Sequence, residues 1–278
     1  MFNKRWLLAW MAAVLGVAFW TQSRRWHKAM SAEPRRAVAC LLRLLAVGGL
    51  VWLPTCGGTP SAPSDILTFA FDFARGAEGW APGFSDYSLL HPQPELMELV
   101  AEHRPLPPPL DVTRGGLFIS GKNFTADLFM FWKRRVDGLR SDRSYGVQFT
   151  VEFATNVPKG IGGIGRADGD VSVKVGVSSA EPVVVPGPVG RCPSYLYCLT
   201  IDKGNQSQGG QDAVVIGTVG NLSGTETWEL KVLRSEPGSL TITPDRGGAL
   251  WLLVGTDSGF EGRTSLYYTR ITAILTPR

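Results

Sequence analysis

Alternation of apolar and polar residues runs through most of the chain from Leu67 onward, and it constrains the fold more than any other feature. Residues 145–153 are apolar at nearly every odd position, while Gln148, Thr150 and Glu152 between them are polar. Successive side chains of a strand point to opposite faces, so a period of two indicates half-buried β-strands.

Nine segments are predicted as strands, most of them by alternation and Ala249–Val254 as a central strand because it is almost wholly apolar. The connections between them are rich in Gly, Pro, Asn and Asp, the residues that favour turns. The predicted strands cover residues 69–73, 118–119, 128–132, 145–153, 171–177, 228–232, 240–242, 249–254 and 265–275. Only Glu95–His103 has helical spacing, and the prolines on either side limit it to a short element. Few helices and many short strands predict an all-β fold, a single antiparallel, jelly-roll-like β-sandwich of about nine strands.

The first 56 residues have a different character, with two apolar runs that each follow basic residues. The second run, Ala37–Leu53, has the positive start, apolar middle and small or polar exit of a secretory signal. Met30 precedes it directly and is a candidate start, and the alternative is a genuine membrane segment upstream. We therefore divide the chain into 1–29 (extension or membrane segment), 30–56 (signal peptide), 57–64 (flexible tether) and 65–278 (β-sandwich domain).

The end of this signal, Leu53-Pro54-Thr55-Cys56, resembles the bacterial lipobox, in which a cysteine receives lipid and becomes the mature N-terminus. The resemblance implies lipidation of Cys56 and a membrane-anchored, extracytoplasmic protein of the bacterial cell envelope. An ordinary signal peptide, in which Cys56 has no such role, is the alternative. Pro54 departs from the usual lipobox pattern.

Charge is divided unevenly along the chain. Residues 1–56 contain eight of the 28 Lys and Arg residues and one of the 24 acidic residues, which leaves 20 basic and 23 acidic residues in 57–278. The basic character of the whole chain therefore comes from its leader, and the domain has a net charge of about −3. Nucleic-acid binding requires a basic face on the folded domain, so we do not expect a nucleic-acid partner.

Cys192 and Cys198 are the two cysteines of the mature domain. An even pair close together in an exported chain predicts a disulfide that closes the Cys-Pro-Ser-Tyr-Leu-Tyr-Cys loop. Two free thiols are the alternative. A zinc site is not expected, because the sequence offers no further cysteine or nearby histidine to complete it.

Several sequence blocks resemble those of a poorly characterised bacterial lipoprotein family with a β-sandwich domain. The blocks are Phe71–Phe73 with Gly79-Trp80, Gly83–Tyr87, Ser120–Asn123 with Asp127–Phe131, Ile201–Ser207 and Gly255–Gly262. The resemblance spans most of residues 66–276 but implies no particular activity.

The chain also resembles, more loosely, the jelly-roll carbohydrate-binding modules. These open with an acidic-aromatic-Gly-Trp strand and close with an aromatic strand like Leu266–Ile271. The resemblance implies glycan binding and leaves a structural calcium open. Many such modules have an aspartate near the position of Thr269 as part of that calcium site, and its absence here counts against the calcium. No other cofactor is expected.

Catalytic motifs are weak. Residues 160–165 match G-x-G-x-x-G, but a dinucleotide site needs a helix next, and a valine-rich strand follows instead. His91 and His103 are the only histidines of the domain, and no G-x-S-x-G or H-E-x-x-H pattern accompanies them. A glycosidase could still use two carboxylates. The candidates lie in or beside predicted turns and are Asp86, Asp127, Asp202, Asp212, Asp257 and Glu261.

The loop 202–212 is dense in amide, acidic and basic groups, of the kind that bind sugar hydroxyls. Tyr195 and Tyr197 in the cysteine loop are candidate stacking platforms. We nominate a ligand-binding set, with no catalytic residue and no metal ligand: Asn123, Asp127, Tyr195, Tyr197, Lys203, Asn205, Asp212, Asp257 and Glu261. Because sandwich loops cluster at sheet ends, Asp127, Lys203, Asn205, Asp257 and Glu261 are expected to share one concave region.

These features favour a non-catalytic domain that binds a glycan or another envelope component. A structural or adhesion protein with an envelope protein as its partner is the first alternative, and a carboxylate-dependent hydrolase is the second.

Overall fold

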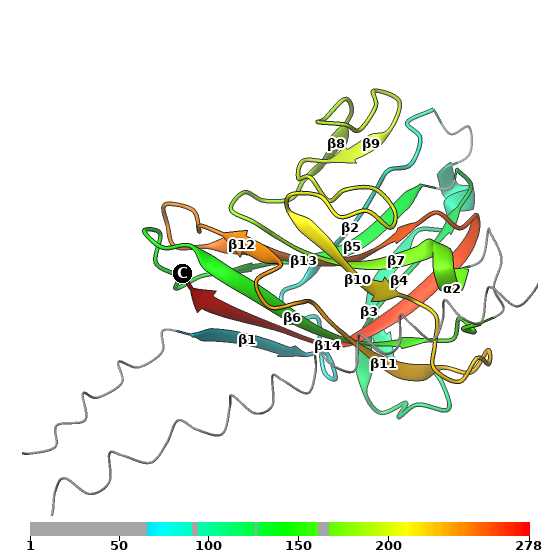
Figure 1. Ribbon diagram of the computed structural model, residues 1–278. Coiled ribbons are helices and arrows are strands. Elements are labelled where there is room, and N and C mark those ends of the chain that lie inside the picture. Colours follow the sequence, from blue (N-terminus) through cyan, green and yellow to red (C-terminus); the bar gives the residue numbers. More distant parts are fainter. Residues whose placement is uncertain (1–65, 91–93, 126, 161–166) are drawn as a thin grey trace, which may run out of the picture. The chain divides into compact units, whose positions relative to one another are not determined.

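Two antiparallel β-sheets make up most of the domain (Figure 1). The structure is a computed structural model, and it describes residues 66–90, 94–125, 127–160 and 167–278. The larger sheet has seven strands in the order β11-β6-β14-β4-β3, with β1 paired to β14 and β12 paired to β6. Its strands are β1 (Leu67–Asp72), β3 (Val100–Pro105), β4 (Gly115–Asn123), β6 (Tyr145–Thr155), β11 (Glu229–Arg234), β12 (Leu240–Ile242) and β14 (Gly262–Pro277).

The second sheet has five strands in the order β10-β7-β13-β5-β2. These are β2 (Ala81–Ser85), β5 (Leu128–Val136), β7 (Val171–Ser178), β10 (Ala213–Thr218) and β13 (Leu250–Ser258). A separate two-stranded hairpin is formed by β8 (Val184–Pro186) and β9 (Tyr197–Leu199). The described residues also contain a 3₁₀ turn, η1 (Pro94–Met97), and one helical turn, α2 (Ala167–Asp170).

The hydrophobic core lies between the two sheets and follows from the alternation in the sequence. Val147, Phe149 and Val151 of β6 are fully buried and belong to the same cluster as the valines of β7. Full burial of a side chain of this size stabilises the fold by roughly 1.5–3 kcal/mol. The fold is thus an all-β sandwich, as the sequence predicts.

All nine predicted strand segments overlap observed strands, namely β1, β4, β5, β6, β7, β11, β12, β13 and β14, and only Phe73, Trp228 and Ala249 fall just outside them. Five further strands in the described residues, β2, β3, β8, β9 and β10, were not predicted. The helical interpretation of Glu95–His103 was wrong beyond Met97. Residues from Val100 onward pair with β4 instead, and His103 lies opposite Leu117. Sheet pairing satisfies the backbone here and outweighs a weak helical pattern.

Residues 179–212 cover the outer face of the five-stranded sheet, the face that points away from the core (Figure 1). Phe129, Phe131 and Leu253 point outward from β5 and β13 and are buried against Leu199 of the covering segment. The sheet is therefore apolar on both faces, and β7 is buried along its whole length. This covering segment positions the candidate site.

Candidate functional site

Two lysines and three aspartates form a buried cluster between the five-stranded sheet and the covering segment. The Lys174 ammonium lies 2.8 Å from Asp257 Oδ2, and both side chains are fully buried. Lys203 Nζ lies 2.8 Å from the same oxygen and 2.5 Å from Asp86 Oδ2. Asp127 completes the group, which we call the Lys–Asp cluster.

Strand alternation explains how the sheet contributes to this cluster. The odd-numbered valines of β7 face the core, so Lys174 points to the outer face. In β13 the core residues Leu250, Leu252 and Val254 are even-numbered, which directs Asp257 outward as well. The sheet register pairs Lys174 with Gly255, two residues from Asp257, so the two charged side chains are diagonal neighbours.

The polar loop 202–212 folds over the cluster and is tied to it by its own backbone. Lys174 Nζ donates to the carbonyl oxygens of Lys203 and Gln208 at 3.0 and 2.9 Å. The Gln206 amide donates to Asp257 Oδ2 at 3.0 Å. These contacts anchor the loop at several points above the sheet and shield Lys174 and Asp257 from solvent.

Two aspartates of the loop hold its turns. The Asp202 carboxylate accepts bonds from the amides of Gly204 and Gln211, at 3.1 Å each. Asp212 accepts from the Asp202 amide at 2.8 Å. Such local bonds are typical of aspartates that shape a loop. Asn205 lies at the loop tip and is exposed.

Asn123 plays a comparable positioning part at the end of β4. Its amide nitrogen donates to the carbonyl oxygens of Ser258 and Phe260, at 2.9 and 3.1 Å. Its Oδ1 accepts from the amides of Thr125 and Asp127. Asn123 therefore fixes the backbone on both sides of the cluster, at Asp127 and just after Asp257.

The electrostatics of the cluster follow from its burial. Burial raises the pKa of Asp127 to about 7, and the charges of Asp86 and Asp257 act in the same direction. Burial also raises the pKa of Asp86, against the opposing charge of Lys203. Burial lowers the pKa of Lys174. For Lys203 the effect of burial is outweighed by the two carboxylates, which raise its pKa.

The three carboxylates each offer an oxygen within 4.8 Å of the others, a spacing at which a cation could be shared. Two ammonium groups already contact Asp86 and Asp257, however, so the chain supplies the positive charge itself. We interpret the cluster as an ion-pair network and not as a metal centre. The position considered for calcium, Thr269, donates its hydroxyl to the carbonyl and carboxylate oxygens of Glu152.

Above the cluster, the chain that follows β2 pairs with the cysteine loop. The Asp86 amide donates to the Tyr197 carbonyl, the Tyr197 amide to the Tyr87 carbonyl, and the Leu89 amide to the Tyr195 carbonyl. In this antiparallel pairing Tyr87 lies opposite Tyr197, so their side chains share a face. The two rings contact at 4.8 Å between centroids, tilted by 36°.

Tyr195 lies in the turn two residues before Tyr197 and is 56% exposed. Asp86 and Leu196 are buried, and the Asp86 carboxylate contacts the Lys203 ammonium. The pairing thus directs its tyrosines outward and its aspartate into the Lys–Asp cluster. We call Tyr87, Tyr195 and Tyr197 the tyrosine surface.

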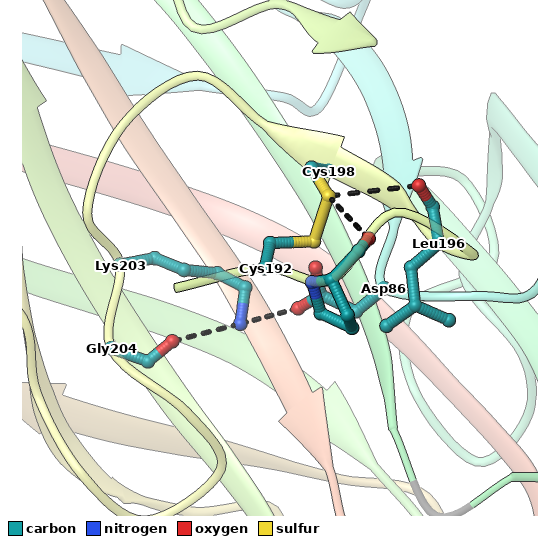
Figure 2. Close-up of a disulfide and its surroundings, with 7 residues drawn as sticks. Asp86, Cys192, Leu196, Cys198, Lys203 and Gly204 are labelled. Atoms are coloured by element: carbon teal, nitrogen blue, oxygen red, sulfur yellow. Dashed lines mark hydrogen bonds and ion pairs between the residues drawn. A yellow bond between two sulfur atoms is a disulfide. The ribbon is translucent and has the colours of Figure 1, made fainter. Parts of the chain in front are cut away.

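The disulfide between Cys192 and Cys198 is present, as predicted, with the two Cα atoms 5.9 Å apart. Figure 2 shows it close to Lys203, whose ammonium points to the Asp86 carboxylate and to the Gly204 carbonyl. The disulfide therefore closes the loop that presents the exposed Tyr195, on the same side of the sheet as the cluster.

The structure brings together part of the nominated site. Asp127, Lys203 and Asp257 meet in the Lys–Asp cluster, with Asn123 as a structural support. Lys203 and Asp257 are buried, however, and paired with one another, so they do not line an open surface. Asn205 and Glu261 are exposed.

Sequence reasoning missed Lys174 and Tyr87. Lys174 is the one charged residue of a valine-rich strand. From the sequence alone it is interpreted as an ordinary solvent-facing residue, because the covering segment cannot be foreseen. Tyr87 stands in the Gly83–Tyr87 block, but only the pairing with the cysteine loop gives it a partner. As for His103, its ring bonds to the Phe73 carbonyl at 2.7 Å.

Several predictions concern residues outside the described ranges. These are the signal peptide and tether, lipidation of Cys56, His91 and most of the glycine-rich motif. No helix among the described residues is long and apolar enough to cross a membrane.

Comparison with known proteins gives a limited result. No protein-family model matches the chain, and no curated protein matches it. Solved structures similar to it include TmCBM27, studied for mannan recognition, with 11% identity, a TM-score of 0.37, and 77% of this chain and 99% of that one covered. TmCBM61, in complex with β-1,4-galactotriose, has 11% identity and a TM-score of 0.32, and the match covers 73% and 89%.

The family 11 carbohydrate-binding module of the cellulase Lic26A-Cel5E of Clostridium thermocellum is a third such structure. It has 9% identity and a TM-score of 0.33, and the match covers 77% of this chain and 97% of that one. At these scores the similarities carry no argument about a ligand. The resemblance to a bacterial lipoprotein family stays a prediction.

Proposed function

We propose that the domain is a non-catalytic glycan-binding module of the bacterial cell envelope and that the tyrosine surface is its contact with the sugar. The observation that carries the proposal is the exposed Tyr195 ring on a segment closed by a disulfide and paired with residues 86–89. A tyrosine ring presents an apolar face to the C–H groups of a sugar and a hydroxyl for hydrogen bonding.

Preorganisation of the backbone supports the tyrosine surface as the binding site. The Lys–Asp cluster and the disulfide hold the backbone beneath Tyr195 in place, so little ordering cost remains when a ligand binds. Asn205 at the tip of the polar loop is exposed and adds an amide of the kind that sugar hydroxyls accept. The aspartates at the centre of the cluster are paired with lysines, which does not favour the pair of available carboxylates that a glycosidase uses.

We further propose that the domain acts outside the cytoplasm and is tethered through lipid on Cys56. The disulfide supports an oxidising compartment, since such bonds are rare in reducing cytosol. The lipobox-like Leu53–Cys56 supplies the proposed anchor.

The test is a glycan array probed with the full chain, alongside Tyr195→Ala and Tyr195→Phe variants. Because the Tyr195 side chain is largely exposed, its removal is expected to change the free energy of unfolding by no more than about 0.5 kcal/mol. Binding that is lost in Tyr195→Ala and largely kept in Tyr195→Phe supports stacking on this ring. Phe124→Ala is the matched control, since Phe124 is a partly exposed aromatic residue in the turn after β4 and does not belong to the tyrosine surface. Glycan binding that is insensitive to Tyr195 rejects the assigned surface, and no binding to any glycan rejects the function.

A further inference from the structure

The geometry points to a covalent cross-link inside the Lys–Asp cluster: an amide bond between the Lys174 side-chain nitrogen and the Asp257 side-chain carboxyl, formed by the folded chain itself. The product is an isopeptide bond that joins the neighbouring strands β7 and β13. The inference is independent of glycan binding.

Proximity is the first argument. Lys174 Nζ and Asp257 Oδ2 lie 2.8 Å apart, on diagonal positions of adjacent strands, and neither side chain is exposed. The two groups are therefore held against one another by the sheet and by the covering loop, which removes most of the entropic barrier to a reaction between them. Water, which would reverse the condensation, is excluded from the pair.

The second argument is the state of the nucleophile. A lysine attacks only as the neutral amine, and burial lowers the pKa of Lys174 toward that form. Proton transfer from the Lys174 ammonium to the Asp257 carboxylate leaves an amine beside a carboxylic acid. In a low-dielectric site this neutral pair competes with the ion pair.

The third argument is stabilisation of the charge that develops on the attacked carboxyl. Asp257 Oδ2 accepts bonds from the Lys203 ammonium at 2.8 Å and from the Gln206 amide at 3.0 Å. Attack by the amine places negative charge on this oxygen, and the two fixed donors face it. This is the arrangement by which an oxyanion hole lowers the barrier to acyl transfer.

Asp127 supplies the proton transfers. Its carboxyl group lies within 4.8 Å of that of Asp257, and the Oδ1 atoms of Asp127 and Asp257 are both buried without a hydrogen-bond partner. The pKa of Asp127 near 7 keeps a proton available at neutral pH. Asp127 is therefore placed to give a proton to Asp257 Oδ1 and to take one back from the Lys174 nitrogen.

The reaction balances without an oxidant or other co-reactant. Asp127 first gives its proton to Asp257 Oδ1 and regains one from the Lys174 ammonium, which leaves a neutral amine beside the acid. The Nζ–Cγ bond then forms, the Cγ–Oδ1 bond breaks, and Oδ1 takes a second proton from Asp127 and leaves as water. The nitrogen returns one proton to Asp127, which ends as it began. One ammonium and one carboxylate are thus converted into one amide and one water.

Peptide mapping of the full, reduced chain tests the proposal directly. Trypsin does not cleave after a lysine whose amine is acylated, so residues 167–191 are expected as one peptide joined to residues 247–263, lighter than the sum by one water. Tandem mass spectrometry then locates the bond. Cleavage after Lys174 and a separate, unmodified 247–263 peptide in the wild-type chain overturns the proposal, as does a bond from Lys203 to Asp86 instead.

Two variants test the roles assigned. Lys174→Arg keeps a cation and is expected to leave the two peptides unlinked. Asp127→Asn keeps the shape of the side chain but does not shuttle a proton, so we expect linked peptide to fall at least tenfold. Protection of the Cys192–Cys198 disulfide from reduction under native conditions reports that each variant is folded. An Asp127→Asn chain that is linked as fully as the wild type rejects Asp127 as the proton carrier.

Discussion

Replacement of Lys203 by alanine is expected to destabilise the domain strongly, because it leaves Asp86 buried without a cation. The two side chains lie 2.5 Å apart and are less than a tenth exposed, so water cannot replace the lost ammonium. Removal of one partner from a buried ion pair costs about 3–5 kcal/mol. The expectation holds whether or not Lys174 and Asp257 are joined, since Asp86 depends on Lys203 in either case.

Urea denaturation measures this effect. With a slope of about 2 kcal/mol per molar, a loss of about 4 kcal/mol lowers the midpoint by about 2 M. Asp86→Asn in the Lys203→Ala background is expected to restore part of the loss, because the amide carries no charge. Arg135→Ala is the matched control. It removes the exposed Arg135–Asp137 ion pair, which is worth about 0–1 kcal/mol. A Lys203→Ala midpoint equal to that of the control refutes the reasoning.

Three further outcomes are expected. The folded-state pKa of Asp127 is raised to about 7, so the contribution of its protonated form to stability is complete below about pH 4 and is lost as the pH rises to about 7. Asp127→Asn should remove this part of the pH dependence of stability, as measured by denaturation between pH 4 and 8. Joint replacement of Cys192 and Cys198 by serine should cost about 2 kcal/mol by denaturation, and an unchanged midpoint contradicts the entropic role assigned to this short loop. Cys56→Ala should shift the protein out of the detergent phase or leave it as a precursor, while an unmodified N-terminus downstream of Cys56 in mass spectra rejects lipidation.

The sequence predicted the sandwich well because its core strands alternate clearly. In β6 the period of two places Val147, Phe149 and Val151 in the core without any knowledge of partners. The strands that escaped prediction are short or carry poor strand formers. β2 includes Pro82 and Gly83, and β8 has only three residues, so their pairing depends on tertiary context.

The candidate site was predicted in part for a related reason. Asp127, Lys203 and Asp257 share the end of one sheet, as expected from sandwich topology. Their burial could not be foreseen, because it depends on a covering segment that packs on the outer face of β5 and β13. The same segment buries Lys174 and pairs Tyr87 with Tyr197. Local sequence patterns do not predict such long-range contacts.

The most direct test of the proposed function is native gel electrophoresis through soluble polysaccharides chosen from the array, with mobility measured against polysaccharide concentration. Loss of a central aromatic contact typically costs more than 1 kcal/mol, so Tyr195→Ala should bind about tenfold more weakly than the wild type, and Phe124→Ala should bind equally well. Equal retardation of the wild type and Tyr195→Ala by the same polysaccharide would contradict the account.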